Sequence, residues 1–385
     1  MIKEEVLKLF PHIVELRRYF HKYPEIAKNE YNTAKKIEEE LISIGLNPIR
    51  VGETGVYAEI ICKNPGKTIV LRADIDALPI NEETNLEFKS QIQNVMHACG
   101  HDIHTASLLG AARILYNHKD ELNGVIRLTF QQAEEIGYGA KIFINEGYLE
   151  GADRCYGLHI ASNLKCGTIA CVTGANNASV DWLKITVKGK ASHISTPEGG
   201  IDALLVLSKI VCEVKSLANN DKLLIGIGKM EAGTAYNIVA EDAYLEGTIR
   251  AFDPNIRKEV KEQIVTIANN IASSYNALVN VEYKDYTSPL INEEVSNNEA
   301  IEVATNLFGS ENVITERKPS LSGDDFAEYI LCVPGTYSYI GTHNDEDEDT
   351  KLPHHNSKLV IDEESLIVGT SMYVGYTMNY LSKWY

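Results

Sequence analysis

The chain has 385 residues, enough for one large domain with an insertion or for two domains. Its 36 basic and 54 acidic side chains give a formal net charge of -18, which argues against nucleic acid or an anionic membrane as a partner. Hydrophobic residues make up 44%, as is ordinary for a globular protein, and no apolar run approaches the roughly 18 residues that span a membrane.

The amino-terminal residues and the cysteines indicate a cytoplasmic location. The first five residues, Met1 to Glu5, carry acids and lack the basic-then-apolar plan of a secretory signal. The seven cysteines show no framework spacing and no Cys-x-x-Cys pair. Six of them lie in mostly apolar surroundings and are expected to be core residues: Cys62, Cys155, Cys166, Cys171, Cys212 and Cys332.

The first part of the chain alternates helices with strands. Apolar residues at helical spacing predict a helix over residues 1–23, which Pro24 ends. A second helix is expected from a cap at Asn29 to Gly45. A third helix is expected over 106–115. Residues 57–62 alternate weakly between apolar and polar, and short apolar runs predict buried strands at 68–71, 124–130 and 154–160. This alternation is typical of an α/β sheet, whose ligands bind at the carboxyl ends of the strands.

The middle of the chain has a different pattern. Long alternating strands are expected at 182–187, 223–230, 243–252 and 278–283, with helices at 201–214 and 255–273. That order predicts a two-layer, ferredoxin-like α+β unit inserted into the first domain. The chain then returns to a helix, a strand and a final helix, at 299–308, 336–340 and 363–381. We therefore expect a catalytic domain in two parts, 1–176 and 288–385, and an inserted domain over 177–287.

The stretch from Met96 to Thr105 packs three imidazoles, a thiol and a carboxylate into ten residues. Cys99 and His101 flank Gly100, which lets the backbone turn so that both side chains point at one centre. A thiolate and an imidazole together suit a borderline divalent ion such as zinc, manganese or cobalt. A buried cysteine with hydrogen-bonded histidines near a helix start is the competing interpretation.

A pair of adjacent carboxylates, Glu134 and Glu135, follows the strand at 124–130. Two neighbouring carboxylates repel each other and are costly to bury, and a nearby cation removes that cost. One of them can then ligate the ion while the other acts as a base on metal-activated water. An exposed loop pair is the alternative. His159 and the pair His354-His355 would, taken alone, be a core histidine and a surface pair.

These stretches resemble the M20 metallopeptidase family, in the amidohydrolase branch with aminoacylases, hippurate hydrolases, N-acetyldiaminopimelate deacetylases and auxin-conjugate hydrolases. The matching motifs cover nearly the whole chain in order. They lie at 20–25, 72–79, 96–105, 130–135, 157–159, 189–193, 233–238 and 247–250.

The resemblance implies two divalent metal ions in each subunit, zinc, manganese, cobalt or nickel. It implies five ligands: Cys99, His101, Glu135, His159 and His355. It makes Glu134 the general base and gives His193 a role in stabilising the oxyanion. Asn237 and Arg250 would bind a substrate carboxylate, and Asp74, Asp76 and Asp102 would orient the ligands or the backbone.

Some positions depart from the family pattern. Glu198 replaces a usual histidine, Asp324 replaces a glutamate, and Asn356-Ser357 replaces a pair that ends in proline. These changes do not alter the expected metal ligands, but they affect the expected substrate preference.

The sequence therefore predicts a cytoplasmic, metal-dependent amidohydrolase acting on N-acyl amino acids. The resemblance implies a homodimer joined through the inserted domain. An aminopeptidase, dipeptidase or carboxypeptidase acting on short peptides is the alternative enzyme. A metal-stabilised binding protein without turnover is the non-enzymatic alternative, and the intact Glu134-Glu135 pair argues against it.

Overall fold

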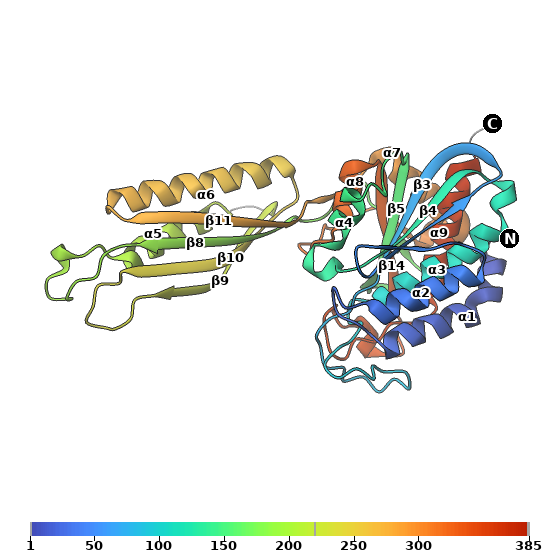
Figure 1. Ribbon diagram of the computed structural model, residues 1–385, viewed down its shortest axis with the longest axis horizontal. Helices are drawn as coiled ribbons and strands as arrows, with labels where there is room; N and C mark the ends of the chain where they lie inside the picture. Colours follow the sequence, from blue (N-terminus) through green and yellow to red (C-terminus); the bar gives the residue numbers. More distant parts are fainter. Residues whose placement is uncertain (1, 219–220, 383–385) are drawn as a thin grey trace. The chain divides into compact units, whose positions relative to one another are not determined.

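The computed structural model describes residues 2–218 and 221–382, which divide into two compact units (Figure 1). Unit 1 comprises Met1–Gly174, Ile291–Lys318 and Asp324–Tyr385, and unit 2 comprises Ala175–Leu290 with Pro319–Gly323. The short strands β7 (Gly174–Asn177) and β12 (Leu290–Asn292) pair with each other where the chain passes from one unit to the other.

Unit 1 is built on an eight-stranded sheet with the order β1-β2-β4-β3-β5-β14-β6-β13. Its strands are β1 (Ile49–Val51), β2 (Gly55–Ile61), β3 (Asn64–Asp74), β4 (Asn123–Gln131), β5 (Arg154–Lys165), β6 (Ile169–Ala170), β13 (Val313–Ile314) and β14 (Gly335–His343). The four central strands β4, β3, β5 and β14 are mutually parallel. Buried apolar residues such as Val70 and Leu71 fill β3, as expected for a strand covered on both faces.

Helices cover both faces of this sheet. They are α1 (Ile2–Lys22), α2 (Tyr31–Ser43), α3 (His101–Asn117), α4 (Gly139–Asn145), α7 (Glu294–Phe308), α8 (Phe326–Cys332) and α9 (Ser365–Ser382). Figure 1 shows α4 and α8 on one side, and α1, α2, α3 and α9 on the other. Helices α3 and α9 are buried along almost their whole length because α1 packs over both of them.

Unit 2 has an antiparallel sheet with the order β11-β8-β10-β9. Its elements are β8 (Val180–Lys188), α5 (Ala203–Ser216), β9 (Leu223–Ala232), β10 (Asp242–Ala251), α6 (Pro254–Ser274) and β11 (Leu278–Thr287). Buried alternate residues of β8, such as Leu183 and Ile185, pack against α5 and α6 in a separate core. The strand and helix order is that of a ferredoxin-like unit.

The predicted fold class, an α/β domain with a smaller α+β unit, is confirmed. Two local predictions were wrong. Of the six cysteines expected in the core, Cys212 and Cys332 are exposed and Cys166 is half-buried. Asn29 does not cap the second helix. Glu30 occupies that position without a side-chain capping bond. The Glu25 carboxylate accepts the backbone amides of Asn32 and Thr33 instead, at 2.9 and 2.8 Å. Within the described residues, no helix is long and apolar enough to cross a membrane.

Candidate active site

Cys99 and His101 are brought together by a sharp turn at Gly100. Gly100 has φ +79, and a Cβ there would lie 2.5 Å from Cδ1 of Ile160. A side chain at this position would therefore be both strained and crowded. Helix α3 begins at His101, five residues before the start that the apolar pattern predicts, so Cys99 and His101 are both buried at its amino end.

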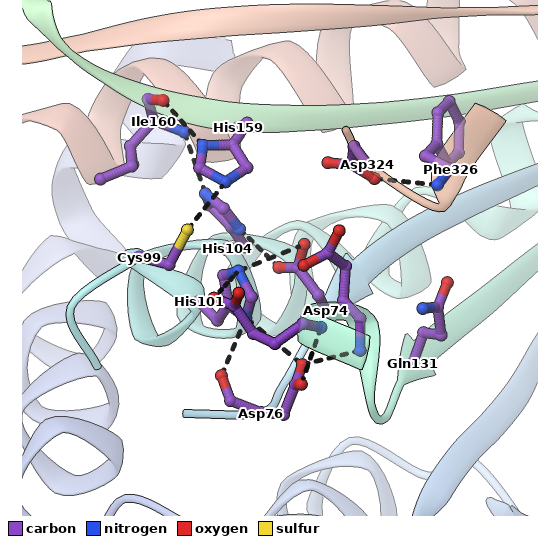
Figure 2. Close-up of polar contacts among 12 residues, drawn as sticks. Asp74, Asp76, Cys99, His101, His104, Gln131, His159, Ile160, Asp324 and Phe326 are labelled. Carbon is purple, nitrogen blue, oxygen red and sulfur yellow. Dashed lines mark hydrogen bonds and ion pairs between the residues drawn. The ribbon is translucent and has the colours of Figure 1, made fainter. Parts of the chain in front are cut away.

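The imidazoles of His159 and His101 lie close to the thiol of Cys99 (Figure 2). The Sγ atom of Cys99 lies 3.4 Å from Nε2 of His159, whose Nδ1 donates to the carbonyl of Ile160 at 2.7 Å. Nδ1 of His101 donates to the carbonyl of Asp76 at 2.8 Å, which leaves its buried Nε2 with no hydrogen-bond partner among the described residues. Each ring is thus oriented by its outer nitrogen, as in protein metal sites.

Glu135 completes one potential ligand group with Cys99 and His101. One ligand atom from each of the three lies within 4.8 Å of the others. Oε1 of Glu135 is 3.8 Å from Nε2 of His101, and this buried oxygen has no hydrogen-bond partner in the part of the chain that the structure describes. Two buried polar atoms that face each other without a bond are costly unless something binds between them.

The adjacent histidines His354 and His355 point to different parts of the cluster. His355 has φ +64, and its Nε2 lies 3.5 Å from Oε2 of Glu135. The His354 ring stacks on His159 with centroids 5.1 Å apart, and one of its nitrogens lies with Cys99 and His159 in a second potential ligand group. His354, which the sequence did not single out as a ligand, is therefore a further candidate beside His355.

His104 is a site residue that sequence reasoning passed over. It lies on α3 beside His101, and its Nδ1 contacts Oδ1 of Asp74 at 2.5 Å. Its Nε2 accepts the backbone N–H of Ile160 at 3.0 Å. Because both of its nitrogens are engaged within the protein, His104 fits a supporting role better than a ligand role. Its spacing from His101, three residues on a helix, was the available signal.

The three predicted supporting carboxylates lie in different places. Asp74 ends β3 and contacts His104. Asp76 contacts His101 and also accepts the backbone N–H groups of Glu134 and Glu135, both at 3.1 Å. Asp102 bonds to Arg17 and His21 instead, at 2.9 and 2.8 Å. Both of these partners lie on α1, so Asp102 joins α3 to α1.

Glu134 belongs to a cluster of three carboxylates. Oxygens of Glu134, Asp324 and Asp325 lie within 4.8 Å of one another. Arg72, fully buried on β3, contacts Asp325 at 2.7 Å and Asp74 at 2.6 Å. Burial raises the pKa of Glu134 well above its usual range, and Asp324 and Glu135 raise it further. Arg72 also lies 3.5 Å from Oδ1 of Asp324. In the sequence, Asp324 stood out only as a departure from the family pattern, and its contact with Arg72 was not predicted.

The ionisation of the cluster is suited to a bound cation. Burial and then Glu135 raise the pKa of the Cys99 thiol well above its usual range. Burial lowers the pKa of His101, but Asp74 and Asp76 outweigh that effect and raise it to about 10. Burial and the neighbouring His104 lower the pKa of His159 well below its usual value. A divalent ion would favour the thiolate and the neutral imidazoles, so the donor set fits a borderline metal.

The turn that carries Glu134 and Glu135 is tied to a buried carboxylate, Glu30. Its Oε1 accepts the N–H of Ala133 at 2.9 Å, and its Oε2 accepts the hydroxyl of Thr54 at 2.7 Å. Burial, followed by the charge of Asp76, raises the pKa of Glu30 from 4.5 to about 7. The ionised side chain therefore costs folding free energy near neutral pH.

Glu30→Gln is expected to stabilise the metal-free protein at alkaline pH. Because the folded-state pKa is raised, the wild type loses stability as the pH rises from 4.5 through 7, whereas glutamine has no proton to lose. Below about pH 4 the free energy of unfolding should depend on pH in the same way for the wild type and for Glu30→Gln. By pH 8 the variant should have gained about 3 kcal/mol of stability relative to the wild type. Urea unfolding at several pH values measures this difference, and a gain that does not grow with pH would contradict it.

The remaining predicted residues, His193, Asn237 and Arg250, belong to unit 2. His193 is exposed, and its Nδ1 contacts the hydroxyl of Ser195 at 2.7 Å. The neighbouring Ile194 donates its N–H to the carbonyl of Asn237 at 3.0 Å, so these two loops lie side by side. Arg250 on β10 is held by Thr248 at 3.1 Å and by the carbonyl of Leu321.

Comparison with known proteins identifies relatives along nearly the whole chain. The model of peptidase family M20/M25/M40 matches residues 70–379. The chain is 38% identical to thermostable carboxypeptidase 1 of Saccharolobus solfataricus over 96% of this chain and 95% of that protein. It is 35% identical to the N-acetyl-L-cysteine deacetylase of Bacillus subtilis, over 92% of this chain and 85% of that protein. The solved YXEP protein of Bacillus subtilis, described as a dinuclear metal-binding peptidase from the M20 family, superposes with a TM-score of 0.87. Its sequence is 33% identical, over 98% of this chain and 99% of that one.

Proposed function

We infer that this chain, which belongs to peptidase family M20/M25/M40, is a metal-dependent hydrolase that cleaves the amide bond of N-acyl amino acids. The observation that carries this proposal is the convergence of Cys99 with Nε2 of His101 and Oε1 of Glu135, two buried atoms that have no hydrogen-bond partner within residues 2–218 and 221–382. The names of two relatives, a deacetylase of N-acetyl-L-cysteine and an amidohydrolase, support the substrate class.

We propose that two divalent ions are held by Cys99, His101, Glu135, His159 and His355. The dinuclear description of the YXEP protein supports the number of ions. When bound, such ions lower the pKa of water and polarise the amide carbonyl. The metal is zinc, manganese, cobalt or nickel, since all four accept thiolate, imidazole and carboxylate ligands.

Glu134 is the proposed general base. Its carboxylate lies beside the ligand Glu135 but outside the group formed by Cys99, His101 and Glu135. It would take a proton from the attacking water and pass it to the leaving amine. Asp76 orients both His101 and the turn of the glutamate pair, Asp74 fixes His104, and Asp102 anchors α3 to α1.

In unit 2 we propose that His193 stabilises the oxyanion and that Asn237 and Arg250 bind the substrate carboxylate. Arginine suits that task because its guanidinium binds a carboxylate with two parallel hydrogen bonds. The assembly proposed is a homodimer through unit 2, whose edge strand β9 exposes Leu224 and Met230. A cytoplasmic location is proposed because all seven cysteines are free.

The experiment that tests this function is a substrate screen with purified protein. The protein is stripped with a chelator, reloaded separately with zinc, manganese, cobalt or nickel, and offered N-acetyl and N-benzoyl amino acids. We expect metal-dependent release of the free amino acid. Metal uptake without hydrolysis of any substrate would contradict the proposal and favour a binding protein.

A carboxypeptidase is the second candidate, because the carboxypeptidase of Saccharolobus solfataricus is 38% identical to this chain. Free dipeptides and longer peptides belong in the same screen. Faster release of a carboxy-terminal residue from peptides than from N-acetyl amino acids would favour this alternative.

A further inference from the structure

The backbone turn that carries Glu134 and Glu135 is held by two buried carboxylates from distant parts of the chain. Glu30 accepts the N–H of Ala133 at 2.9 Å. Asp76 accepts the next two, with Oδ1 3.1 Å from the nitrogen of Glu134 and Oδ2 3.1 Å from the nitrogen of Glu135. Three successive N–H groups thus end on two buried carboxyl groups.

The turn needs such support for two reasons. Ala133 has φ +55, a left-handed conformation that costs a residue with a side chain about 1 kcal/mol or more. The carboxylates of Glu134 and Glu135 also repel each other in a buried setting. Without restraint on the backbone, the side chains of Glu134 and Glu135 would not keep the two different orientations that a base and a metal ligand need.

The Glu30 carboxylate is not explained by helix capping. Glu30 precedes α2, yet its side chain makes no capping bond to that helix. The Glu25 carboxylate bonds to the amides of Asn32 and Thr33, at the start of the same helix. Glu30 is completely buried, and its oxygens bond to Ala133 and to Thr54, which are 103 and 24 residues away. A buried carboxylate with a pKa raised to about 7 is costly to keep.

We propose that Glu30 is a positioning residue, which holds the Ala133–Glu135 turn so that Glu134 can act as base and Glu135 can bind metal. The proposal rests on the function proposed above for the two glutamates. Its effect passes through the backbone of Ala133, since Glu30 accepts that N–H directly.

The test compares four variants. Glu30→Ala removes both hydrogen bonds, and Glu30→Asp keeps the charge but is one methylene too short to reach both Thr54 and Ala133. Glu30→Gln can still accept from Ala133 through its oxygen and donate to Thr54 through its amide. Glu25→Ala is the matched control, because it removes the hydrogen bonds of another carboxylate at the start of α2 and leaves the turn intact. Each variant is measured for kcat, KM, metal affinity and melting temperature.

We expect Glu30→Ala and Glu30→Asp to lower both kcat at saturating metal and metal affinity by about 10- to 100-fold, with KM nearly unchanged. Glu30→Gln should remain near wild type in both. Glu25→Ala should lower the melting temperature while keeping kcat and metal affinity. If Glu30→Ala fails to fold, Glu30→Asp and Glu30→Gln still decide the matter.

Three results would overturn the proposal: wild-type kcat and metal affinity in Glu30→Asp, an equal loss in Glu25→Ala, or a loss in Glu30→Gln as large as in Glu30→Ala. Metal affinity is measured without substrate. A wild type that hydrolyses nothing would therefore defeat the proposed function, while the affinities would still show whether Glu30 holds the turn.

Discussion

Glu134→Gln is expected to lower kcat by about 1000-fold or more while leaving the bound metal unchanged. Glutamine has the size of glutamate but cannot take up the proton of the attacking water. The ligand group of Cys99, His101 and Glu135 does not include Glu134, so the metal should remain. Burial, and then repulsion from Asp324 and Glu135, raises the pKa of Glu134. The neutral amide removes both costs, so the variant should be at least as stable as the wild type.

The measurement pairs single-substrate kinetics with the metal content of the same protein sample. Glu135→Gln is the matched control, because it makes the same chemical change one residue away, on the proposed ligand. It should lose metal together with activity. If Glu134→Gln kept the wild-type rate, or lost its metal as Glu135→Gln does, the division of roles between the two glutamates would be wrong.

Removal of the metal is expected to abolish activity reversibly and to lower the melting temperature. Among the residues that the structure describes, buried atoms of His101, Glu135 and His354 have no hydrogen-bond partner, and a bound ion would satisfy them. An ion that binds only the folded state stabilises it by about 2.7 kcal/mol at 100 times its dissociation constant. Metal affinity should rise with pH, because burial keeps the Cys99 thiol protonated and binding must release that proton.

Cys99→Ser tests the origin of this effect. It should weaken metal binding by more than about 100-fold and remove most of the difference in melting temperature between loaded and chelated protein. Cys62→Ser is the control, since Cys62 is also a buried thiol, with a pKa that burial raises to about 11, and it is outside the ligand groups. Equal melting temperatures for loaded and chelated wild type would contradict the prediction.

The sequence by itself determined the architecture and the identity of the family. Periodicity predicted the strand and helix order of unit 2, because alternation reports which face of a strand is buried. The motifs around Cys99 and Glu134 indicated the M20 resemblance, which the family match over residues 70–379 confirms. The pairing of Cys99 with His101 was also predictable, because a two-residue spacing across a glycine is a local property.

The tertiary structure alone decided which distant residues support the site. Parallel pairing of β3, β4 and β5 brings Asp74, Gln131 and His159 to one region, although they come from separate strands. Arg72 and Asp325 are 253 residues apart, and Glu30 and Ala133 are 103 residues apart. His354 and His355 point in different directions because His355 has a positive φ. Spacing along the chain carries information about contacts within one helix or strand. Contacts between elements depend on sheet register and on backbone turns. Local sequence patterns do not predict either of these.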